Sequence, residues 1–371
     1  MKKINTKLLI ILLIFIFFST TGARCGTLPG GAIKEGKPDP ITINYWKVYD
    51  EKSNFNELIN LYQKNNPHVT IKYKTFTPQE YETELVNALA EDRGPDIFSI
   101  QTTWMRKYQA KIEPLPTKIT TYSTFEAGSI RKETYTKANE KNTLTLRNIK
   151  ELYPDVIYDN QVIGDKIYGL PLNLDTMALF YNRDLLNNAG ITAPPATWDE
   201  FVNQVNRLTK LDDHGNIISA GAAIGTAYNV SRATDLLSLL IMQLFIPNGG
   251  QITDNRNNAI FNKNPKTYSG SGLLAASALN FYNSFAAPSS DVYTWDSDMP
   301  NSRQAFMESR VAFYFGYAYD IPVIKTQAPK LNFDTAPMPQ QSANLVNFAN
   351  YWVETCLLYT SDAADDLLCV D

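Results

Sequence analysis

The spacing of apolar and polar residues over residues 40–100 changes repeatedly between two periods. Some stretches are continuously apolar or alternate apolar with polar, as strands do, and others repeat an apolar residue every three or four positions, as helices do. The predicted strands lie at residues 41–46, 69–75 and 97–100, and the predicted helices at residues 55–62 and 78–91. Strands that alternate with helices indicate a doubly wound parallel sheet, which binds ligands beyond the carboxyl ends of its strands.

Helix start and stop signals support this interpretation. Pro67 ends the first helix, and Thr77 with Glu80 forms a capping box at the start of the second, with Pro78 at its first position. Further along, Gly190 lies where a helix end favours a residue with positive φ. These signals place helix boundaries next to the predicted strands.

The second half of the chain repeats the alternation. Strands are predicted at residues 220–225, 311–315 and 333–339, helices at residues 233–245, 273–285 and 305–307, a turn at residues 249–250, and re-entry into the first sheet at residues 347–354. Residues 117–158 are rich in Thr and Lys with weak periodicity, so we expect a surface excursion there. About 330 residues remain once both ends are set aside, which exceeds one ordinary core and suggests two lobes.

The start of the chain has the features of an export signal. A lysine-rich segment precedes the apolar run 8–18, which small and polar residues follow. A membrane-spanning helix needs about 20 apolar residues, and this run is shorter. Cys25 lies where the acylated cysteine of a lipoprotein would be, although Arg24 stands where Gly or Ala is expected. We expect lipidation at Cys25, with a plain cleaved signal or an uncleaved anchor as the alternatives.

The end of the chain breaks the preceding pattern. From Cys356 it reads CLLYTSDAADDLLCVD, and residues 356–366 resemble one reading frame of a transposon adapter used in preparing sequencing libraries. We therefore expect residues 356–371 to be a non-native tail and the native sequence to be truncated near Thr355. A short amphipathic C-terminal helix is the alternative.

Composition excludes several classes of protein. The formal net charge of -4 and the pI of about 5.4 give no basic surface for nucleic acid. Of the three cysteines, only Cys25 lies outside the expected tail, so no disulfide framework is predicted. The chain has 2 histidines, too few for a histidine-rich zinc site. We expect neither a metal nor a cofactor.

Residues 165–201 combine several signals in a fixed order. A Tyr-Gly-Leu-Pro turn occupies residues 168–171, a Tyr-Asn-Arg-Asp step residues 181–184, and a Pro-x-Thr-Trp-x-Glu helix start residues 195–200, where Thr and Glu again form a capping box. This series resembles the extracellular solute-binding proteins of ABC importers, in family 1, whose members are similar to maltose-binding protein and mostly carry sugars. The resemblance covers about residues 41–355.

The resemblance implies a two-lobed periplasmic-binding-protein fold of type II, in the α/β class, in which each lobe is a doubly wound sheet flanked by helices. The family's final stretch, which completes both lobes, is missing from this sequence. The expected division is a signal peptide at 1–24, a linker after the cysteine at 25–40, an N-terminal lobe at 41–173, a C-terminal lobe at 174–338, a return to the N-terminal lobe at 339–355 and the tail at 356–371.

The implied function is that of an extracytoplasmic, non-enzymatic receptor, bound to the membrane through an N-terminal lipid or free in the periplasm. It would act as a monomer, close its two lobes on a carbohydrate in the cleft between them, and deliver it to the transmembrane subunits of an ABC permease. A secreted glycan-degrading hydrolase is the alternative from another class. A third possibility, a ligand sensor for a surface kinase, differs from the transport receptor only in its partner protein.

Sugar recognition needs flat rings that stack on the apolar face of a pyranose and planar polar groups that pair with its hydroxyls. The chain has 21 Tyr, 18 Phe and 5 Trp, so the position of an aromatic residue, rather than the number of such residues, must distinguish a binding residue from a core residue. The candidates follow predicted strands or lie in the crossing and the re-entry: Trp46, Tyr49, Asp50, Gln101, Thr102, Trp104, Asn173, Asp175, Tyr317, Tyr319, Tyr351 and Trp352. In relatives, the positions of Asp175, Tyr317 and the loop 101–104 commonly touch the sugar. Asp175 could instead be a cap or a hinge residue, and Trp104 could pack under its own helix.

Other conspicuous residues are better explained without a ligand. Tyr181 and Trp198 belong to the motif and are expected to pack in the core. The loop 212–216 lacks the ligand spacing of a calcium loop and is expected to be an ordinary turn. A glycosidase needs two carboxyl groups at a fixed separation, and Asp96, in a Gly-Pro-Asp turn, is expected to be structural. The sequence offers no catalytic pair.

Overall fold

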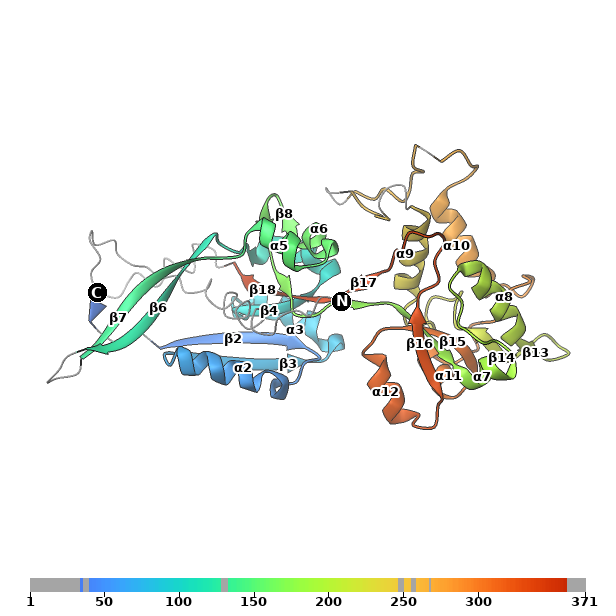
Figure 1. Cartoon of the computed structure of the whole chain (residues 1–371), viewed down its shortest axis with the longest axis horizontal. Helices are drawn as coiled ribbons and strands as arrows, with labels where there is room; N and C mark the ends of the chain where they lie inside the picture. The colour runs from blue at the N-terminus through green and yellow to red at the C-terminus, as the bar shows by residue number, and fades with distance from the viewer. Residues whose placement is uncertain are drawn as a thin grey trace. The chain divides into compact units, whose positions relative to one another are not determined.

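The computed structural model describes residues 34–35, 40–127, 133–245, 250–254, 258–266 and 268–358, and of residues 34–35, 120–127 and 133–138 it describes the backbone only. The chain divides into two compact units, Met1–Leu174 with Tyr351–Asp371, and Asp175–Asn350 (Figure 1), which we call the first and the second lobe. The expected signal peptide, Cys25, most of the expected linker, residue 249 of the predicted turn and residues 359–371 of the expected tail lie outside the described residues.

A six-stranded sheet forms the centre of the first lobe, in the order β10-β18-β4-β2-β3, with β5 also pairing with β18 (Figure 1). Its strands are β2 (Ile41–Val48), β3 (Val69–Phe76), β4 (Ile97–Gln101), β5 (Ile112–Glu113), β10 (Leu170–Pro171) and β18 (Trp352–Leu357). β2 is parallel to both β3 and β4, whereas β18 is antiparallel to β4. The three predicted strands of this region are confirmed, and the antiparallel β18 makes the sheet mixed.

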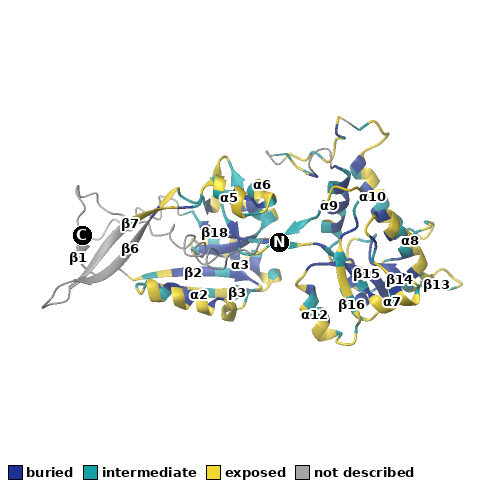
Figure 2. Cartoon of the chain, viewed as in Figure 1, coloured by how far each residue is buried: buried dark blue, intermediate teal, exposed yellow. Residues whose placement is uncertain are grey.

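Helices α2 (Lys52–Asn65) and α3 (Pro78–Ala90) connect these parallel strands. The capping box predicted for α3 is present, because Thr77 and Glu80 each accept the other's backbone N–H. One face of α2 is buried through Phe55, Ile59 and Tyr62, at the spacing that the sequence predicted. In Figure 2 the central strands of this lobe carry buried residues, whereas α2 is mostly exposed.

Residues 117–158 contain more regular structure than the sequence predicted. β6 (Lys118–Ala127) and β7 (Glu133–Asn142) form a long antiparallel hairpin, to which β1 (Lys34–Glu35) adds a third strand. The further elements of the lobe are short: α4 (Met105–Tyr108), α5 (Leu146–Leu152), α6 (Asp155–Gln161), β8 (Val162–Ile163) and β9 (Lys166–Ile167). The hairpin was missed because its Thr-rich strands lack a clear apolar and polar alternation.

The second lobe has a five-stranded sheet in the order β13-β14-β15-β12-β16. Its strands are β12 (Ala178–Asn182), β13 (Lys210–Leu211), β14 (Ile217–Ala222), β15 (Val311–Gly316) and β16 (Phe333–Pro337). Its helices are α7 (Arg183–Asn188), α8 (Trp198–Leu208), α9 (Ala233–Leu244), α10 (Leu274–Ser284), α11 (Ser302–Met307) and α12 (Asp320–Gln327). β14 and β15 are parallel, and β12 is antiparallel to both of its neighbours.

The core of the second lobe confirms the packing role of the motif residues. Trp198 is buried against Phe201 and Phe281, and the half-buried Tyr181 packs against the same cluster. Gly190 has the predicted positive φ, 67°. The cap of α8 differs slightly from the prediction, because Thr197 accepts the Glu200 N–H while the Glu200 carboxylate accepts the N–H of Ala196. The helix start is still fixed from both sides.

The chain passes between the lobes at Leu174 to Asp175 and again at Asn350 to Tyr351. The second passage lies later than the expected return at residue 339. Residues 339–350 remain with the second lobe because their backbone bonds to it: the Gln340 N–H donates to Ala196 O at 2.9 Å, and Gln243 Nε2 donates to Val346 O at 3.2 Å. In addition, β11 (Asp175–Thr176) pairs with β17 (Ala349–Asn350).

The first two residues of the expected tail lie in the sheet. Cys356 is buried and lies opposite Ile97 and Glu113, so Cys356 and Leu357 complete β18 as sheet residues. Both side chains continue the largely apolar character of this strand, which explains why they fit the sheet. Among the described residues, no helix combines the length and apolarity that crossing a bilayer requires.

Candidate functional site

Three aromatic side chains meet at one edge of the first-lobe sheet. β2 and β4 are parallel and end at Val48 and Gln101, and the antiparallel β18 begins at Trp352, directly opposite Gln101. The residues that follow β2 and β4 and the first residue of β18 therefore share one edge of the sheet. This geometry brings together Tyr49, Trp104 and Trp352, which we call the aromatic edge cluster.

Trp352 is the centre of the aromatic edge cluster. Its ring lies 5.6 Å from Trp104 at 76° and 6.3 Å from Tyr49 at 80°, so both neighbours meet it edge to face. Behind it, the buried Tyr81 lies 5.9 Å away at 71°. Tyr49 is 56% exposed, and the two tryptophans are partly exposed. Rings set at right angles offer a flat face with a wall beside it.

Tyr49 has an unusual backbone conformation for a bulky residue, with φ at 68°. A local bond and the neighbouring strand β3 hold it there. The Asp50 N–H donates to Val48 O at 2.8 Å, and the Asp50 carbonyl accepts from Tyr73 Oη at 2.8 Å and from Thr75 Oγ1 at 3.0 Å. Backbone strain of this kind concentrates at functional sites. The fold therefore stabilises a strained backbone that presents an exposed ring.

A buried polar network lies on the same strands. Lys47 and Glu354 are 3% and 1% exposed, and Lys47 Nζ lies 2.5 Å from Glu354 Oε1. Glu354 Oε2 accepts from Tyr45 Oη at 2.7 Å and from Ser99 Oγ at 2.8 Å. Burial, and then Glu354, raise the pKa of Tyr45; burial lowers the pKa of Lys47, but Glu354 and Asp50 outweigh it and leave that pKa raised. Lys47 and Glu354 are thus held as a charged pair inside the sheet.

Several predicted site residues of the first lobe have other partners. The ring of Trp46 packs on Phe76 at 4.7 Å with Lys74 Nζ 5.0 Å from the Trp46 ring centroid. The Asp50 carboxylate lies 3.2 Å from Lys47 Nζ. Tyr351 is buried, and its hydroxyl accepts from Asn160 Nδ2 at 3.0 Å.

The loop after β4 is also tied to the interior of the lobe. Gln101 accepts from Thr103 Oγ1, and Thr102 Oγ1 accepts from Gln161 Nε2 at 3.1 Å. The Thr102 N–H donates to the Tyr351 carbonyl at 3.1 Å. Asn173, in the passage to the second lobe, is exposed. Gln101 and Thr102 thus lie close to Trp104 along the chain, and Tyr351 is a core residue.

In the second lobe, Asp175 organises the loop that follows β15. Its Oδ2 accepts the Ala318 N–H at 2.9 Å, and its Oδ1 accepts the Thr176 N–H at 2.9 Å. Burial raises the pKa of the Asp175 carboxyl, although the backbone N–H groups of Thr176, Ala318 and Tyr319 oppose this. Asp175 therefore fixes the backbone next to Tyr319.

The two tyrosines of this loop differ in exposure. Tyr317 is 0% exposed, and its hydroxyl donates to Asp235 Oδ2 at 2.8 Å. Burial, and then Asp235, raise the pKa of Tyr317. Tyr319 is 40% exposed, and its ring lies nearly parallel to that of Tyr317, 6.1 Å away at 19°. The ring that can meet a ligand in this conformation is that of Tyr319.

The sequence reasoning missed two residues of this group. Arg232 precedes α9, and its Nη2 donates to Tyr319 Oη at 2.5 Å. Asp235, in the first turn of α9, lies 3.7 Å from Arg232 Nη1. Asp235 is the sole charged residue within α9, ATDLLSLLIMQL, and a charge in an apolar helix is a signal that could have found it.

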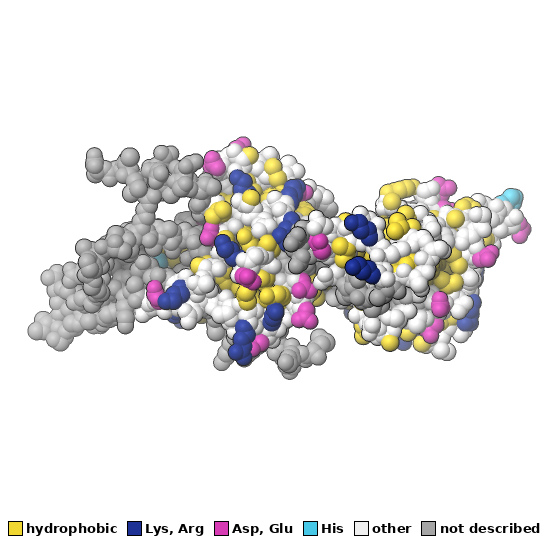
Figure 3. Space-filling model, turned by 90° about the horizontal axis from the view of Figure 1, so that it is seen from above, with side chains coloured by type: hydrophobic (Ala, Val, Ile, Leu, Met, Phe, Trp, Pro, Cys, Tyr) yellow, Lys and Arg dark blue, Asp and Glu magenta, His cyan; other side chains and the backbone are white. Residues whose placement is uncertain are grey.

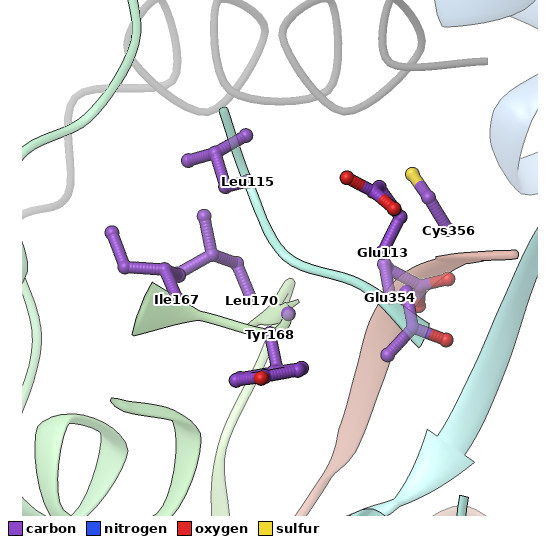
Figure 4. Close-up of a pocket in the computed structure, with 9 residues that line it drawn as sticks. Glu113, Leu115, Ile167, Tyr168, Leu170, Glu354 and Cys356 are labelled. Carbon is purple, nitrogen blue, oxygen red and sulfur yellow. The ribbon is translucent and has the colours of Figure 1, made fainter. Parts of the chain in front are cut away.

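A pocket of the first lobe contains the Tyr-Gly-Leu-Pro turn (Figure 4). Leu115, Ile167 and Leu170 gather on one side, while Glu113, Glu354 and Cys356 lie on the other. Gly169 is required there, because a Cβ would lie 2.6 Å from Val353 Cγ1 and 2.8 Å from the Glu354 carbonyl oxygen. The motif thus serves close packing on β18, and none of the predicted ligand residues lines this pocket.

Charged side chains give no indication of a metal or a catalytic pair. On the face shown in Figure 3, positive and negative side chains of the first lobe are interspersed, and neither sign covers a continuous area. In the described ranges, no three His, Cys, Asp or Glu side chains form a group suited to a metal ion. Asp96 accepts the backbone N–H of Asn44 at 2.7 Å, as its predicted structural role requires. Asp212 accepts the N–H groups of His214 and Asn216, as an ordinary turn does.

The fold and the grouping of ligand-type side chains at strand ends define a two-lobed α/β binding protein. The sequence profile of the bacterial extracellular solute-binding proteins matches residues 47–355. The chain belongs to this family, which consists of binding proteins rather than enzymes and is extracytoplasmic.

Individual relatives match shorter stretches. A putative binding protein of Brucella abortus is 25% identical over 159 residues, which are 42% of this chain and 32% of that protein. A galactooligosaccharide-binding protein of Bacillus subtilis is 31% identical over 55 residues, 15% of this chain and 13% of that protein. The matched stretches thus span less than two thirds of these relatives.

Solved structures match most of the chain. An ABC substrate-binding protein from Listeria monocytogenes, in complex with cycloalternan, has a TM-score of 0.59 at 16% identity, over 87% of this chain and 72% of that one. The sugar-binding protein MalE from Xanthomonas citri has a TM-score of 0.57 at 19% identity, over 88% and 74%. At such identities the likeness concerns the fold, and it confirms the predicted two-lobed type.

Proposed function

We propose that the protein is the receptor of an ABC importer that binds a sugar or oligosaccharide and delivers it to the permease. The observation that carries this proposal is the aromatic edge cluster, in which a strained backbone presents Tyr49 next to Trp104 and Trp352. Rings in this arrangement suit the apolar face of a pyranose. On the second lobe, the exposed ring of Tyr319 is the corresponding candidate.

The known ligands of relatives support a carbohydrate. The Listeria protein binds cycloalternan, a related protein from Thermotoga lettingae binds α-D-tagatose, and the Bacillus relative is named for galactooligosaccharides. These ligands differ in size, so they favour a class of substrate rather than one sugar. The remaining predicted residues, such as Asn173 and Gln101, would add hydrogen bonds to the sugar hydroxyls.

Calorimetry on the full chain against monosaccharides and neutral oligosaccharides tests the proposal. We expect one carbohydrate to bind with a stoichiometry of one and to change the tryptophan fluorescence. Trp198→Phe is the matched control, because Trp198 is buried in the second-lobe core and its removal should leave the ligand-induced change in place. Failure of the whole panel, with amino acids or peptides binding instead, would overturn the carbohydrate assignment.

Turnover separates the receptor from the alternative hydrolase. We expect the bound carbohydrate to be recovered unchanged after prolonged incubation, because the family to which the chain belongs consists of binding proteins. Release of shorter sugars would favour the hydrolase. Stimulation of a reconstituted permease's ATPase by the loaded receptor would favour import over signalling to a surface kinase.

We also propose that Cys25 carries the lipid that holds the protein at the membrane. Two features support this: the export signal at residues 1–24 and the position of Cys25 directly after it. Cys25→Ala should move the protein from the membrane fraction to the soluble fraction or block its processing. An unchanged membrane fraction in this variant would show that the lipid is not the anchor.

A further inference from the structure

The loop after β15 places one exposed tyrosine ring on one buried ring. Tyr319 is 40% exposed, and Tyr317 beneath it is 0% exposed, with their rings 6.1 Å apart at 19°. The Tyr317 hydroxyl is fixed by Asp235 at 2.8 Å. The buried ring is therefore held from below and gives Tyr319 a rigid surface on which to rest.

Arg232 reaches this pair of rings from another element. Its guanidinium carbon lies 4.9 Å from the centre of the Tyr317 ring and 5.5 Å from that of Tyr319, and its Nη2 donates to Tyr319 Oη at 2.5 Å. The Arg232 side chain is 27% exposed and has Asp235 3.7 Å away. One side chain thus contacts both rings and also fixes the hydroxyl of the exposed one.

The backbone of Tyr319 is restrained independently. Asp175, 143 positions earlier in the chain, accepts the Ala318 N–H, and the buried Asp320 accepts the Tyr317 N–H at 3.3 Å. Gly316 permits this close packing, because a Cβ there would lie 2.6 Å from Asp320 Oδ2. With the backbone fixed by carboxylates, the remaining freedom of Tyr319 is in its side chain, and this is what Arg232 restricts.

Restricting an exposed ring before a ligand arrives has an energetic consequence. A free aromatic side chain must lose rotational freedom when a ligand stacks on it, and this loss weakens binding. A ring already held by a guanidinium and a neighbouring ring does not incur that loss on binding. The contacts of Arg232 therefore serve binding in addition to packing, because its partly buried guanidinium lies against an exposed ring.

We propose that Arg232 is a positioning residue of the second-lobe ligand site, which orients the ring of Tyr319 so that Tyr319, and not Tyr317, stacks on the ligand. This inference rests on the proposed carbohydrate function. It assigns distinct tasks to neighbouring residues: Tyr319 contacts the sugar, Tyr317 supports it from within, Asp175 fixes the loop, and Arg232 acts through Tyr319.

A double-mutant cycle on carbohydrate affinity tests this assignment. Tyr319→Ala should weaken binding by about tenfold, the loss of one stacking surface, and Arg232→Gln by about three- to fivefold. In the Tyr319→Ala background, Arg232→Gln should have no further effect, because its target is gone. Arg232→Lys should restore only part of the affinity, because an ammonium lacks the planar geometry of the guanidinium. If Arg232→Gln weakens binding equally with and without Tyr319, Arg232 contacts the ligand itself and the proposal is wrong.

Arg183→Gln is the matched control. Like Arg232, Arg183 lies on the second lobe and has an aspartate within ion-pair distance, with its Nη1 3.9 Å from Asp334 Oδ2. Both of these side chains are exposed. This variant should leave affinity and thermal unfolding unchanged. Arg232→Gln should likewise leave thermal unfolding nearly unchanged, and a large loss of stability would assign Arg232 to folding instead.

A ligand-free measurement separates failure of this inference from failure of the proposed function. With 3-fluorotyrosine incorporated, the ¹⁹F signal of Tyr319 should shift and narrow in Arg232→Gln, while that of Tyr317 should remain in place. If no carbohydrate binds to the wild-type chain but this shift is seen, the proposed function fails and the ordering of Tyr319 by Arg232 stands. If the Tyr319 signal is unchanged in the variant, the positioning role is overturned whatever the ligand.

Discussion

The first aromatic residue after a central strand differs between the two lobes. In the first lobe Tyr49, which follows β2, is 56% exposed, and the charged pair Lys47 and Glu354 is buried inside the sheet. In the second lobe Tyr317, which follows β15, is 0% exposed; its hydroxyl donates to the partly exposed Asp235, and its backbone N–H donates to the buried Asp320. A position directly after a strand therefore does not decide by itself whether an aromatic ring can meet a ligand.

The cause lies in one strand of each lobe, β18 in the first and β15 in the second. β18 inserts beside β4 and brings Glu354 opposite Ser99, so the sheet must supply Lys47, Tyr45 and Ser99 as partners inside the core. β15 is buried along its whole length, and the chain continues buried through Tyr317. Its polar partner Asp235 comes from the first turn of a helix, where it is still reachable by solvent.

The largest expected effect concerns the buried pair. Glu354→Ala should lower the free energy of unfolding of the first lobe by about 3–5 kcal/mol, because it leaves Lys47 charged and buried without its main partner. Hydrogen exchange measured separately for β2 and β18 would detect this loss. Glu308→Ala, which removes an exposed pair with Arg310 at 3.8 Å, is the control and should change stability by less than about 1 kcal/mol.

The apolar double variant Lys47→Met with Glu354→Leu sharpens this test. Replacing both charges removes the desolvation cost together with the attraction, so most of the lost stability should return. If the double variant is as unstable as Glu354→Ala, the hydrogen bonds from Tyr45 and Ser99, rather than the ion pair, dominate the network.

The sequence predicted β2, β3 and β4 of the first sheet and β14, β15 and β16 of the second because their periodicity is local, and it missed β12, which lies between β15 and β16. It also predicted Tyr49, Trp104 and Trp352, because residues after parallel strands gather at one edge. It could not predict Glu354, whose partner Lys47 is 307 positions away, or the role of Asp175, whose partner is 143 positions away. Nor could it separate Tyr317 from Tyr319, because a strand buried on both faces gives no alternation from which exposure can be deduced.

A second test compares those two tyrosines. Tyr317→Ala should lower the stability of the second lobe by about 3–5 kcal/mol, because it removes a fully buried ring. Tyr319→Ala should change stability by less than about 1 kcal/mol, since its ring is partly exposed. Denaturant unfolding of both variants measures the difference. Normal stability of Tyr317→Ala combined with lost carbohydrate binding would instead make Tyr317 a ligand contact.

A third test concerns the first lobe. Trp104→Ala should weaken carbohydrate binding by about tenfold, because it removes one wall of the aromatic edge cluster. Trp46→Ala is the matched control: its ring packs on Phe76 below Lys74, and its removal should leave the affinity within about twofold. Calorimetry measures both. Equal losses would place Trp46 in the site, as its position after the first predicted strand suggested.

The smallest expected effect is the pH dependence of Asp175, and it follows from the direction of its pKa. Burial raises this pKa above its ordinary value of 3.8, so the folded state binds the proton more tightly than the unfolded state. The contribution of this proton to the free energy of unfolding is fully present below pH 3.8, and it is lost as the pH rises through the pKa of Asp175 in the folded state. Asp175→Asn removes this titration while keeping an oxygen that can accept the Ala318 N–H. The stability of the wild type relative to Asp175→Asn should therefore increase as the pH falls from about 7 toward 4, by at most about 0.5 kcal/mol, since solvent screens a half-exposed carboxyl. A relative stability that decreases over this interval would mean that the hydrogen bonds from Thr176, Ala318 and Tyr319 outweigh burial and stabilise the charged form of Asp175.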